Sequence, residues 1–401
     1  MTTLPKLALI PSGYKASKVY SPLPTNGDGD FTFSRTTLNA TRVNENGLIE
    51  SVDSNVPRLD YLDSNCPSLL LEPQRRNLFL NSEDFTSWSK IRTTITGNQS
   101  IAPDGSNNAD LLTGDGTGTS YVYDDVFLYT ANYYISVFVK NINGDDFTIQ
   151  NFTQAGVVTF DLTNGTVTSV SGTMSEAKIK QYSNNWYRVS AKITSTLGGA
   201  TANLGFGVKN YNGDQFYIWG AQIEDNGLGG SVSYLSSYIP TTSSQKTRII
   251  EYVSNSYTGL TNTNGTIFIE LETKNVDINF SKIIALRDTV TGESLRLEGF
   301  ESGGVKKISF FGINGVLSTP PNADTLPVNT RKKIALTFKD GNFKYASDGV
   351  ITTGTYSGTA RKYNQIGGAN ITGGAMHNSV ISQLMVFDEV LSDAELISLT
   401  T

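Results

Sequence analysis

Between Asn77 and Thr242 the chain repeats one pattern, in which short segments of alternating apolar and polar residues are separated by turns such as Asn143-Gly144. Alternation with a period of two places successive side chains on opposite faces of a strand, and Asn-Gly is the preferred sequence of a tight hairpin turn. The clearest segments are 133–140 (YYISVFVK), 186–193 (WYRVSAKI) and 215–223 (QFYIWGAQI). This succession predicts an antiparallel two-sheet β-sandwich of the jelly-roll, carbohydrate-binding-module-like type.

The last part of the chain predicts a second antiparallel sandwich. After the polar stretch 243–248, strand-like segments recur, among them 266–272 (TIFIELE), 333–338 and 381–387 (ISQLMVF). Ser392 followed by Glu395 forms a capping box, which predicts a short terminal helix over 393–399. The order of these segments resembles the concanavalin-like, laminin-G-type lectin domain. An all-β chain with two sandwiches is therefore expected.

The first part of the chain has too few strands for a core of its own. Short apolar runs alternate with turns up to Asp60, with a hairpin predicted over 41–50, and a small ribbon of this kind is marginally stable alone. Pro57, Pro67 and Pro73 then interrupt regular structure. We expect an extended N-terminal attachment arm and strap. The predicted domains are residues 1–76, 77–245 and 246–401.

Several phrases of the sequence point to one family. PRLDY, CPSLLLEPQRRNLF, NSEDFTSW, FYIWGAQIE and SYIPTT together resemble a family of tailed-bacteriophage virion proteins, described as tail fibre or structural proteins, over roughly Leu9 to Thr242. The resemblance implies a structural protein of the virion, on its head or tail, assembled in the bacterial cytoplasm. It also implies contacts with other virion proteins and projection of lectin-like domains toward host or mucosal glycans.

Charge and cysteine content narrow the range of partners. The 401-residue chain has a formal net charge of −6, which argues against a nucleic-acid partner, because phosphates require a basic face. The single cysteine, Cys66, excludes a disulfide framework within one chain. No signal peptide is predicted at the N-terminus, and no apolar stretch is long enough to insert into a membrane.

Residues for familiar catalytic chemistry are scarce. The chain has one histidine, His377, and it contains no nucleophile elbow, P-loop or HExxH helix. Glu270 and Glu272 alternate onto one strand face, but the third acid that usually accompanies such a pair is missing. We therefore expect no enzymatic activity. A tail-borne glycan depolymerase and a purely architectural capsid decoration protein are the alternatives.

The binding residues expected by type are the tryptophans, because aromatic rings stack on sugar rings. Trp186, Trp88 and Trp219 are the carbohydrate-binding candidates, although core packing accounts for each of them as well. Calcium could bind among loop acids, but no motif supports it, and no cofactor is predicted. These acids are Asp124, Asp125, Asp145, Asp146, Glu224 and Asp225.

Assembly is predicted from the apolar residues of the arm. Leu69, Leu70, Leu71, Phe31 and Phe33 lie too far apart in the sequence to form one private core. Burying several copies of the arm together under rotational symmetry would cover them. We therefore expect a homo-oligomer, on the family resemblance a trimer, with these residues at the attachment and oligomer interface.

Overall fold

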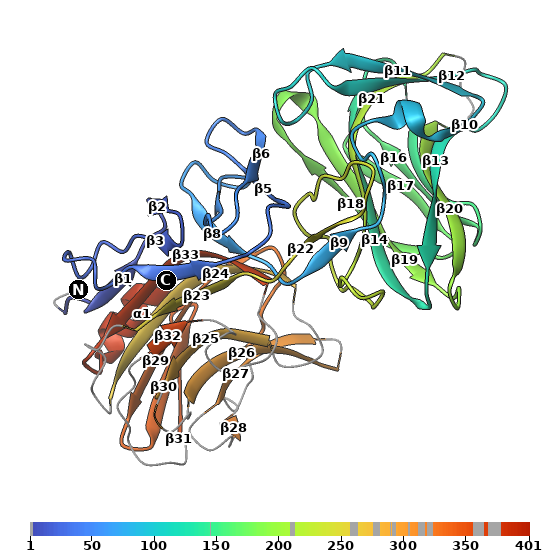
Figure 1. Cartoon of the computed structure of the whole chain (residues 1–401). Helices are drawn as coiled ribbons and strands as arrows, with labels where there is room; N and C mark the ends of the chain where they lie inside the picture. The colour runs from blue at the N-terminus through green and yellow to red at the C-terminus, as the bar shows by residue number, and fades with distance from the viewer. Residues whose placement is uncertain are drawn as a thin grey trace. The chain divides into compact units, whose positions relative to one another are not determined.

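The computed structural model shows an all-β protein in which antiparallel sheets pack in pairs (Figure 1). It describes residues 3–144, 146–208, 213–256, 264–275, 281–288, 290, 294–303, 305–311, 317–318, 324–355, 365–367 and 378–401. Across these residues, no helix is long and apolar enough to cross a membrane. The chain divides into two compact units. Unit 1 comprises residues 1–36, 54–73 and 249–401, and unit 2 comprises residues 37–53 and 74–248.

Unit 2 is a sandwich of two antiparallel sheets. The first, named here the β13 sheet, has the strand order β10 (Ser89–Ile91), β13 (Ser120–Leu128), β20 (Ala200–Val208), β15 (Asp146–Asn151), β16 (Gly156–Asp161), β17 (Thr166–Ser171). The second, the β14 sheet, has the order β11 (Thr93–Ser100), β12 (Ala109–Gly114), β21 (Gln215–Asp225), β14 (Ala131–Asn141), β19 (Tyr187–Ser195), β18 (Met174–Gln181). At its border β9 (Arg75–Asn77) pairs with β21 and with β22 (Lys246–Arg248).

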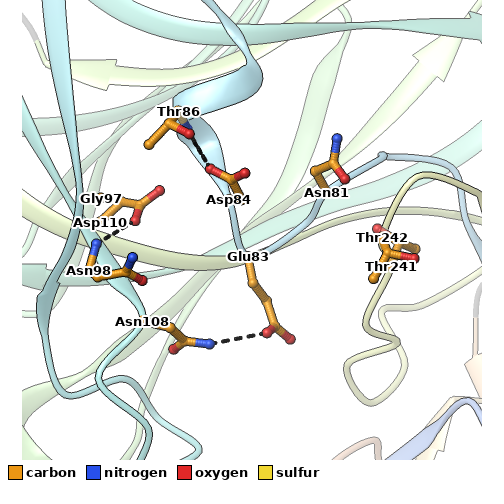
Figure 2. Close-up of a pocket in the computed structure, with 10 residues that line it drawn as sticks. All are labelled: Asn81, Glu83, Asp84, Thr86, Gly97, Asn98, Asn108, Asp110, Thr241 and Thr242. Atoms are coloured by element: carbon orange, nitrogen blue, oxygen red, sulfur yellow. Dashed lines mark hydrogen bonds between the residues drawn. The ribbon is translucent and has the colours of Figure 1, made fainter.

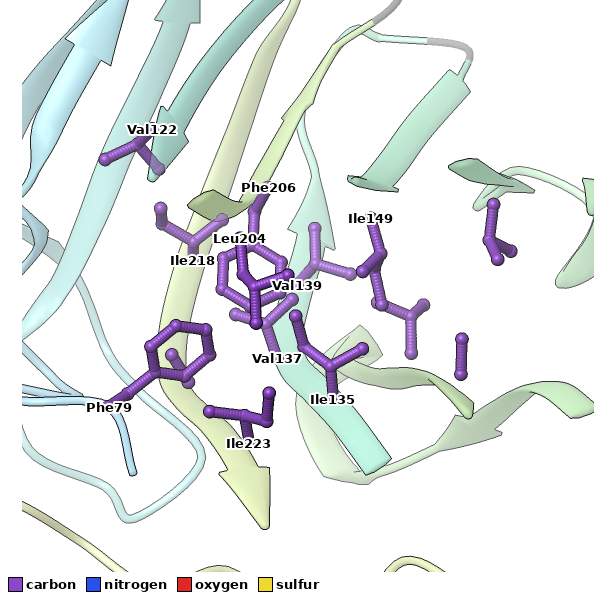
Figure 3. Close-up of a cluster of buried hydrophobic side chains, with 14 of the residues drawn as sticks. Phe79, Val122, Ile135, Val137, Val139, Ile149, Leu204, Phe206, Ile218 and Ile223 are labelled. Carbon is purple, nitrogen blue, oxygen red and sulfur yellow. The ribbon is translucent and has the colours of Figure 1, made fainter. Parts of the chain in front are cut away.

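The core of unit 2 lies between these sheets. Figure 3 shows Ile135, Val137 and Val139 of β14 close to Leu204 and Phe206 of β20. Alternate residues of β14 (133, 135, 137 and 139) and of β20 (202, 204, 206 and 208) enter this core, as the period-two pattern predicts. The hairpin of β5 (Ala40–Val43) and β6 (Ile49–Val52) also belongs to unit 2, and its predicted turn is confirmed by the pairing of Val43 with Ile49.

Unit 1 is a second sandwich, assembled from both ends of the chain. One sheet has the order β31 (Val350–Thr355), β30 (Asn342–Ser347), β29 (Arg331–Lys339), β24 (Gly265–Asn275), β33 (Asn378–Phe387), β8 (Ser68–Leu71), β7 (Leu59–Asp60), with β1 (Leu7–Leu9) also on β33. The other has the order β2 (Tyr14–Lys15), β3 (Lys18–Val19), β4 (Phe31–Ser34), β23 (Tyr252–Asn255), β32 (Gln365–Gly367), β25 (Ser281–Arg287), β26 (Ser294–Ser302), β27 (Val305–Phe311), β28 (Leu317–Ser318).

A short helix covers the outer face of the sheet of unit 1 that contains β24. Helix α1 (Asp393–Thr400) has Ser392 as its N-cap, and both hydrogen bonds of the predicted capping box to Glu395 are present. Leu396 and Leu399 of the helix pack against Phe268 and Phe387 of the sheet. The helix predicted from this local sequence is confirmed.

The prediction of a separate N-terminal arm over residues 1–76 is wrong, because most of these residues belong to unit 1. Leu69 and Leu71 are buried in the core of unit 1, where β8 pairs with β33, and Leu70 is 5% exposed in the same strand. Phe31 and Phe33 face the same core from β4. The physical reason is that strand pairing needs no proximity in sequence, so apolar residues from both ends of the chain complete one core. These five side chains are packed within their own chain, and they no longer support an oligomer interface.

A buried ion-pair network joins the N-terminal segments of unit 1 to its C-terminal part. Glu251 accepts hydrogen bonds from Arg35 Nη1 at 3.0 Å and from Arg58 Nε at 2.8 Å, and Arg58 Nη1 lies 2.8 Å from Glu72 Oε2. The backbone N–H of Glu72 also donates to Glu251 at 3.0 Å. The side chains of Arg35, Arg58 and Glu251 are 0% exposed. Burial alone would lower the pKa of Arg58, but Glu251 and Glu72 outweigh it and raise that pKa. A buried charge is tolerated only with such partners.

Replacing Arg58 by Met tests this network. The substitution leaves two buried carboxylates short of a cation, so we expect a loss of about 3–5 kcal/mol in the unfolding free energy of unit 1. All three tryptophans lie in unit 2. Denaturant unfolding followed by far-UV circular dichroism should therefore show an early transition that tryptophan fluorescence does not follow.

The matched control is Arg42→Met, which breaks the partly exposed Arg42–Glu50 pair of unit 2. It should cost about 1 kcal/mol or less. Equal losses for the two variants would contradict the role given to the buried network.

Candidate functional site

Two polar pockets in unit 2 share one residue, Glu83. The larger has a volume of about 420 Å³ and is shown in Figure 2. Its lining comes from three places in the sequence: the segment 81–86, strands β11 and β12 with the loop between them, and Thr241 with Thr242. The phrases NSEDFTSW and SYIPTT of the sequence thus meet at one site.

A buried carboxylate fixes the shape of the larger pocket. Asp110, 2% exposed, accepts hydrogen bonds from the backbone N–H of Phe85 at 2.8 Å and of Asn98 at 3.0 Å. Phe85 opens the short 3-10 helix η1 (Phe85–Ser87), and Asn98 lies where β11 bulges out of register with β12. Desolvation is the largest influence on the Asp110 carboxyl and raises its pKa. The aspartate is therefore a structural tie between two loops.

The smaller pocket, with a volume of about 220 Å³, lies beside the outer face of the β14 sheet. It is lined by Trp219 of β21, by Tyr238 and Pro240, by Glu83 and Asp104, and by residues of the β5–β6 hairpin (Thr41, Ile49, Glu50, Ser51). Trp219 comes from the phrase FYIWGAQIE. A third phrase of the sequence therefore converges on the same region.

Glu83 is a half-buried carboxylate that both pockets share. Its Oε1 accepts a hydrogen bond from the Tyr238 hydroxyl at 3.1 Å, and its Oε2 accepts one from Asn108 Nδ2 at 3.3 Å. Within the described part of the chain no lysine or arginine forms an ion pair with it. Desolvation raises its pKa, and the nearby Asp104 adds to the rise against the two hydrogen bonds. Perturbed carboxyls in a pocket are typical of binding and catalytic sites.

Trp219 lies on the outer face of the β14 sheet, next to a β-bulge in β21. Ser136 of β14 pairs with Gln222 and Phe138 with Trp219, so β21 carries one extra residue here, and Gly220 takes φ +64°. The left-handed conformation is open to glycine without steric cost. Phe216 and Ile218 face the core on one side of the bulge, and Ala221 and Ile223 do so on the other. Trp219, one residue after Ile218, faces outward beside Tyr238, with ring centroids 4.9 Å apart, and the extra residue Gly220 returns Ala221 and Ile223 to the core.

The three predicted tryptophans have different environments. Trp88 and Trp186 are buried, and each indole N–H donates to a backbone carbonyl, Leu80 O at 3.1 Å and Ile101 O at 3.2 Å. Core packing accounts for both. Trp219 is 1% exposed and lines the smaller pocket, yet its Nε1–H has no acceptor among the described residues. Its ring is too covered to be a stacking platform.

An aromatic stripe on the β13 sheet was not predicted from the sequence. Tyr121, Tyr123 and Phe127 alternate along β13 on the face away from the core, and Tyr129 continues the series past its end. Phe127 and Tyr129 are 52% and 51% exposed, and their rings lie 5.4 Å apart. The period-two spacing of aromatics in YVYDDVFLY is the sequence pattern that could have revealed it.

The neighbouring strands leave room for these rings. Tyr121 pairs with Gly207 of β20 and Tyr123 with Gly205. A Cβ at Gly207 would lie 2.0 Å from Ser120 O, so only glycine fits there. The Tyr121 ring stacks on Phe152 at 3.9 Å. Next along β13, Asp125 accepts a hydrogen bond from Asn203. The stripe therefore combines flat apolar rings with polar groups at its centre.

The other predicted residues give no site in the described structure. Glu270 faces Arg331 at 3.6 Å, and Glu272 pairs with Lys274. Glu224 is held by Ser236, and Asp225 by Arg76. No cluster of three or more metal-binding side chains occurs among the described residues. Cys66 is exposed, whereas His377 and Asp145 lie outside the described residues.

Comparisons with known proteins give distant matches. No family model matches the chain, and no curated protein matches it. Among solved structures, a Trypanosoma rangeli sialidase bound to the inhibitor DANA matches at 9% identity and a TM-score of 0.28, covering 73% of this chain and 60% of the sialidase. The same enzyme as a covalent intermediate matches at 10% identity and a TM-score of 0.29, covering 92% and 77%. Mouse laminin α1 domains LG4-5 match at 8% identity and a TM-score of 0.22, covering 79% and 88%.

These matches correct one expectation. The chain was expected to have no enzymatic activity, but the structures that it matches include sialidases, which are enzymes, so that prediction does not stand. The chain spans about 60% of the length of the first sialidase. TM-scores below 0.5 assign no activity or ligand to it.

The pKa of Glu83 predicts how the stability of unit 2 depends on pH. Because this pKa is raised above 4.5 in the folded protein, the unfolded state ionises first as pH rises, and unit 2 loses stability from about pH 4.5 up to the folded pKa. Glu83→Gln removes this loss. We expect its melting temperature to exceed that of the unmodified chain by a few degrees at pH 7, and to equal it near pH 4.

Calorimetry over this pH range checks the prediction. The control is Glu45→Gln, an exposed acid of the same unit, which should change little at either pH. If Glu83→Gln melted lower than the unmodified chain at pH 7, the carboxylate would be stabilising and the prediction would fail.

Proposed function

We propose that this chain is a structural protein of a tailed-bacteriophage virion that binds neutral or weakly charged glycans through the β13 sheet of unit 2. The aromatic stripe at Tyr121, Tyr123, Phe127 and Tyr129 is the observation that carries the binding part of the proposal. Half-exposed and exposed aromatic side chains gathered on one face of a sheet are uncommon on a surface without a binding role.

The chemistry of the stripe suits a sugar polymer. The faces of pyranose rings carry C–H groups that pack on aromatic rings, and their edges carry hydroxyls that need polar partners. Asp125 and Asn203 lie between the two aromatic pairs and provide such partners. From Tyr121 to Tyr129 the chain, extended over β13 and the residue after it, spans about 27 Å at 3.4 Å per residue. A row of this length on a sheet face favours an extended chain of several sugars over a single ring.

The virion part of the proposal is supported by sequence. The phrases that resemble tailed-phage structural proteins supply Glu83, Trp219 and Tyr238, which line the two pockets of unit 2. A location in the virion, contacts with capsid or tail proteins and a trimeric assembly remain predictions. The assembly needs contacts other than Leu69, Leu70, Leu71, Phe31 and Phe33, which the core of unit 1 uses.

Removing single rings of the stripe tests glycan binding. We expect Tyr121→Ala and Phe127→Ala each to weaken binding to bacterial surface polysaccharides at least about tenfold, equivalent to about 1.4 kcal/mol. The measurement is affinity electrophoresis against capsular and O-antigen polysaccharides, with reducing-end release followed in the same samples. Tyr20→Ala, which removes an exposed aromatic of unit 1, is the control. Binding that is unchanged in both stripe variants would contradict the proposal.

The virion part needs a separate experiment. Antibodies against the purified chain should label particles of the phage that encodes it, at the head or at the tail, in negative-stain images. We expect the antibodies to bind at one site on the particle, in a rotationally symmetric arrangement. Particles that carry no label, while the lysate contains the free protein, would overturn this part and leave glycan binding untouched.

A further inference from the structure

Residues that line the smaller pocket of unit 2 include a hydrogen-bond donor without an acceptor and acceptors with unused capacity, all stated for the described residues. The buried Trp219 Nε1–H is a donor without an acceptor among the described residues. Asp104 Oδ1 accepts from Ser106, whereas its Oδ2 accepts no hydrogen bond there. Glu83 receives one hydrogen bond on each oxygen and has lone pairs to spare. A buried donor left without a partner is costly, which points to a group that fills the pocket.

The charge of the lining selects that group. Glu50, Glu83 and Asp104 line the smaller pocket, Asp84 and Asp110 line the larger one, and neither lining contains a lysine or arginine. Arg42 is the cation on the hairpin, and it is paired with Glu50. A carboxylated, sulfated or phosphorylated ligand would require cations or an excess of donors. The pocket therefore disfavours anions.

A sugar hydroxyl meets both requirements. A hydroxyl accepts one hydrogen bond while it donates another, so one hydroxyl can accept a hydrogen bond from the Trp219 Nε1–H and donate one to a carboxylate. An ammonium group can donate but cannot accept. A volume of about 220 Å³ is below the usual range of about 300–1,000 Å³ for drug-sized ligands, which favours one ring over an oligosaccharide.

We propose that the smaller pocket binds a single neutral hexose at the end of a glycan chain, with Trp219 donating to a ring hydroxyl while Glu83 and Asp104 accept from others. The ligand class is that of the proposed function, on which the inference rests, but the residues are different. The aromatic stripe would bind several consecutive sugars of a glycan, and the pocket would bind its terminal sugar.

Methyl glycosides provide the probe. Titration of the full chain with the methyl glycosides of glucose, galactose and mannose, followed by tryptophan fluorescence and ligand-observed NMR, should show saturable binding of at least one. The methyl glycoside of glucuronic acid differs from that of glucose only in carrying a carboxylate at C6. We expect a neutral hexoside to bind at least about tenfold more tightly than this uronide.

Two substitutions assign the binding to the pocket. Trp219→Phe keeps an aromatic ring and removes the N–H, and it should weaken binding of the neutral hexoside about tenfold. Glu83→Gln removes the negative charge. It should lower the ratio of the affinity for the neutral hexoside to the affinity for the uronide by about threefold. Glu45→Gln is the exposed-acid control and should change neither. Thermal unfolding of each variant shows whether it is folded. If Trp219→Phe unfolds unit 2, Glu83→Gln alone decides.

The outcomes separate this inference from glycan binding at the stripe. Loss of hexoside binding in Trp219→Phe, with Tyr121→Ala unaffected, supports the pocket. Hexoside binding that is lost in Tyr121→Ala but retained in Trp219→Phe and Glu83→Gln overturns the pocket and keeps the stripe. Failure of all three neutral hexosides to bind at 50 mM, roughly the weakest affinity that such a site can have, overturns the pocket, whatever polysaccharide binding shows. Equal or tighter binding of the uronide also overturns it.

Discussion

The buried carboxylate of Glu251 is the point on which the architecture of unit 1 depends. It forms ion pairs with Arg35 and Arg58 of the N-terminal part of the chain, and it accepts a hydrogen bond from the backbone N–H of Glu72. These groups cannot leave it without exposing an unpaired charge to a dry interior. Residues 1–36 and 54–73 are therefore fixed within the sandwich that residues 249–401 complete. Unit 2 is formed from the two stretches of chain that interrupt this sandwich.

Local patterns were sufficient to predict the elements of the fold but not their grouping. The strands of unit 2 follow from a period of two, and helix α1 follows from Ser392 and Glu395 alone. The pairing of Leu7 to Leu9 with residues 384–386 leaves no trace in either segment, because a strand edge accepts any partner of suitable register. The predicted arm was therefore assigned to an interface between chains, when its apolar residues complete a core within one.

The candidate site shows the same limit. Trp219 was expected to pack in a core, and it is buried, but it lies outside the core between the sheets, because Phe216 and Ile218 face that core and Trp219, one residue on, faces the opposite side. Glu83 lies in a phrase singled out for its resemblance, but nothing in its neighbours along the sequence shows that it would be half-buried with no lysine or arginine of the described residues paired to it. Its surroundings include Tyr238, Asp104 and Asn108, which lie 21 or more residues away in the sequence. The aromatic stripe on β13 was predictable in principle, because its spacing is local.

The central claim is that glycans bind to unit 2 and that the stripe on β13 holds them. Crystals of the full chain soaked with a neutral oligosaccharide that binds in solution test this most directly. The account predicts electron density for consecutive sugar rings over Tyr121, Tyr123 and Phe127, with hydroxyls near Asp125 and Asn203. Ordered sugar on unit 1 alone, with the β13 sheet bare at saturating ligand, would contradict it.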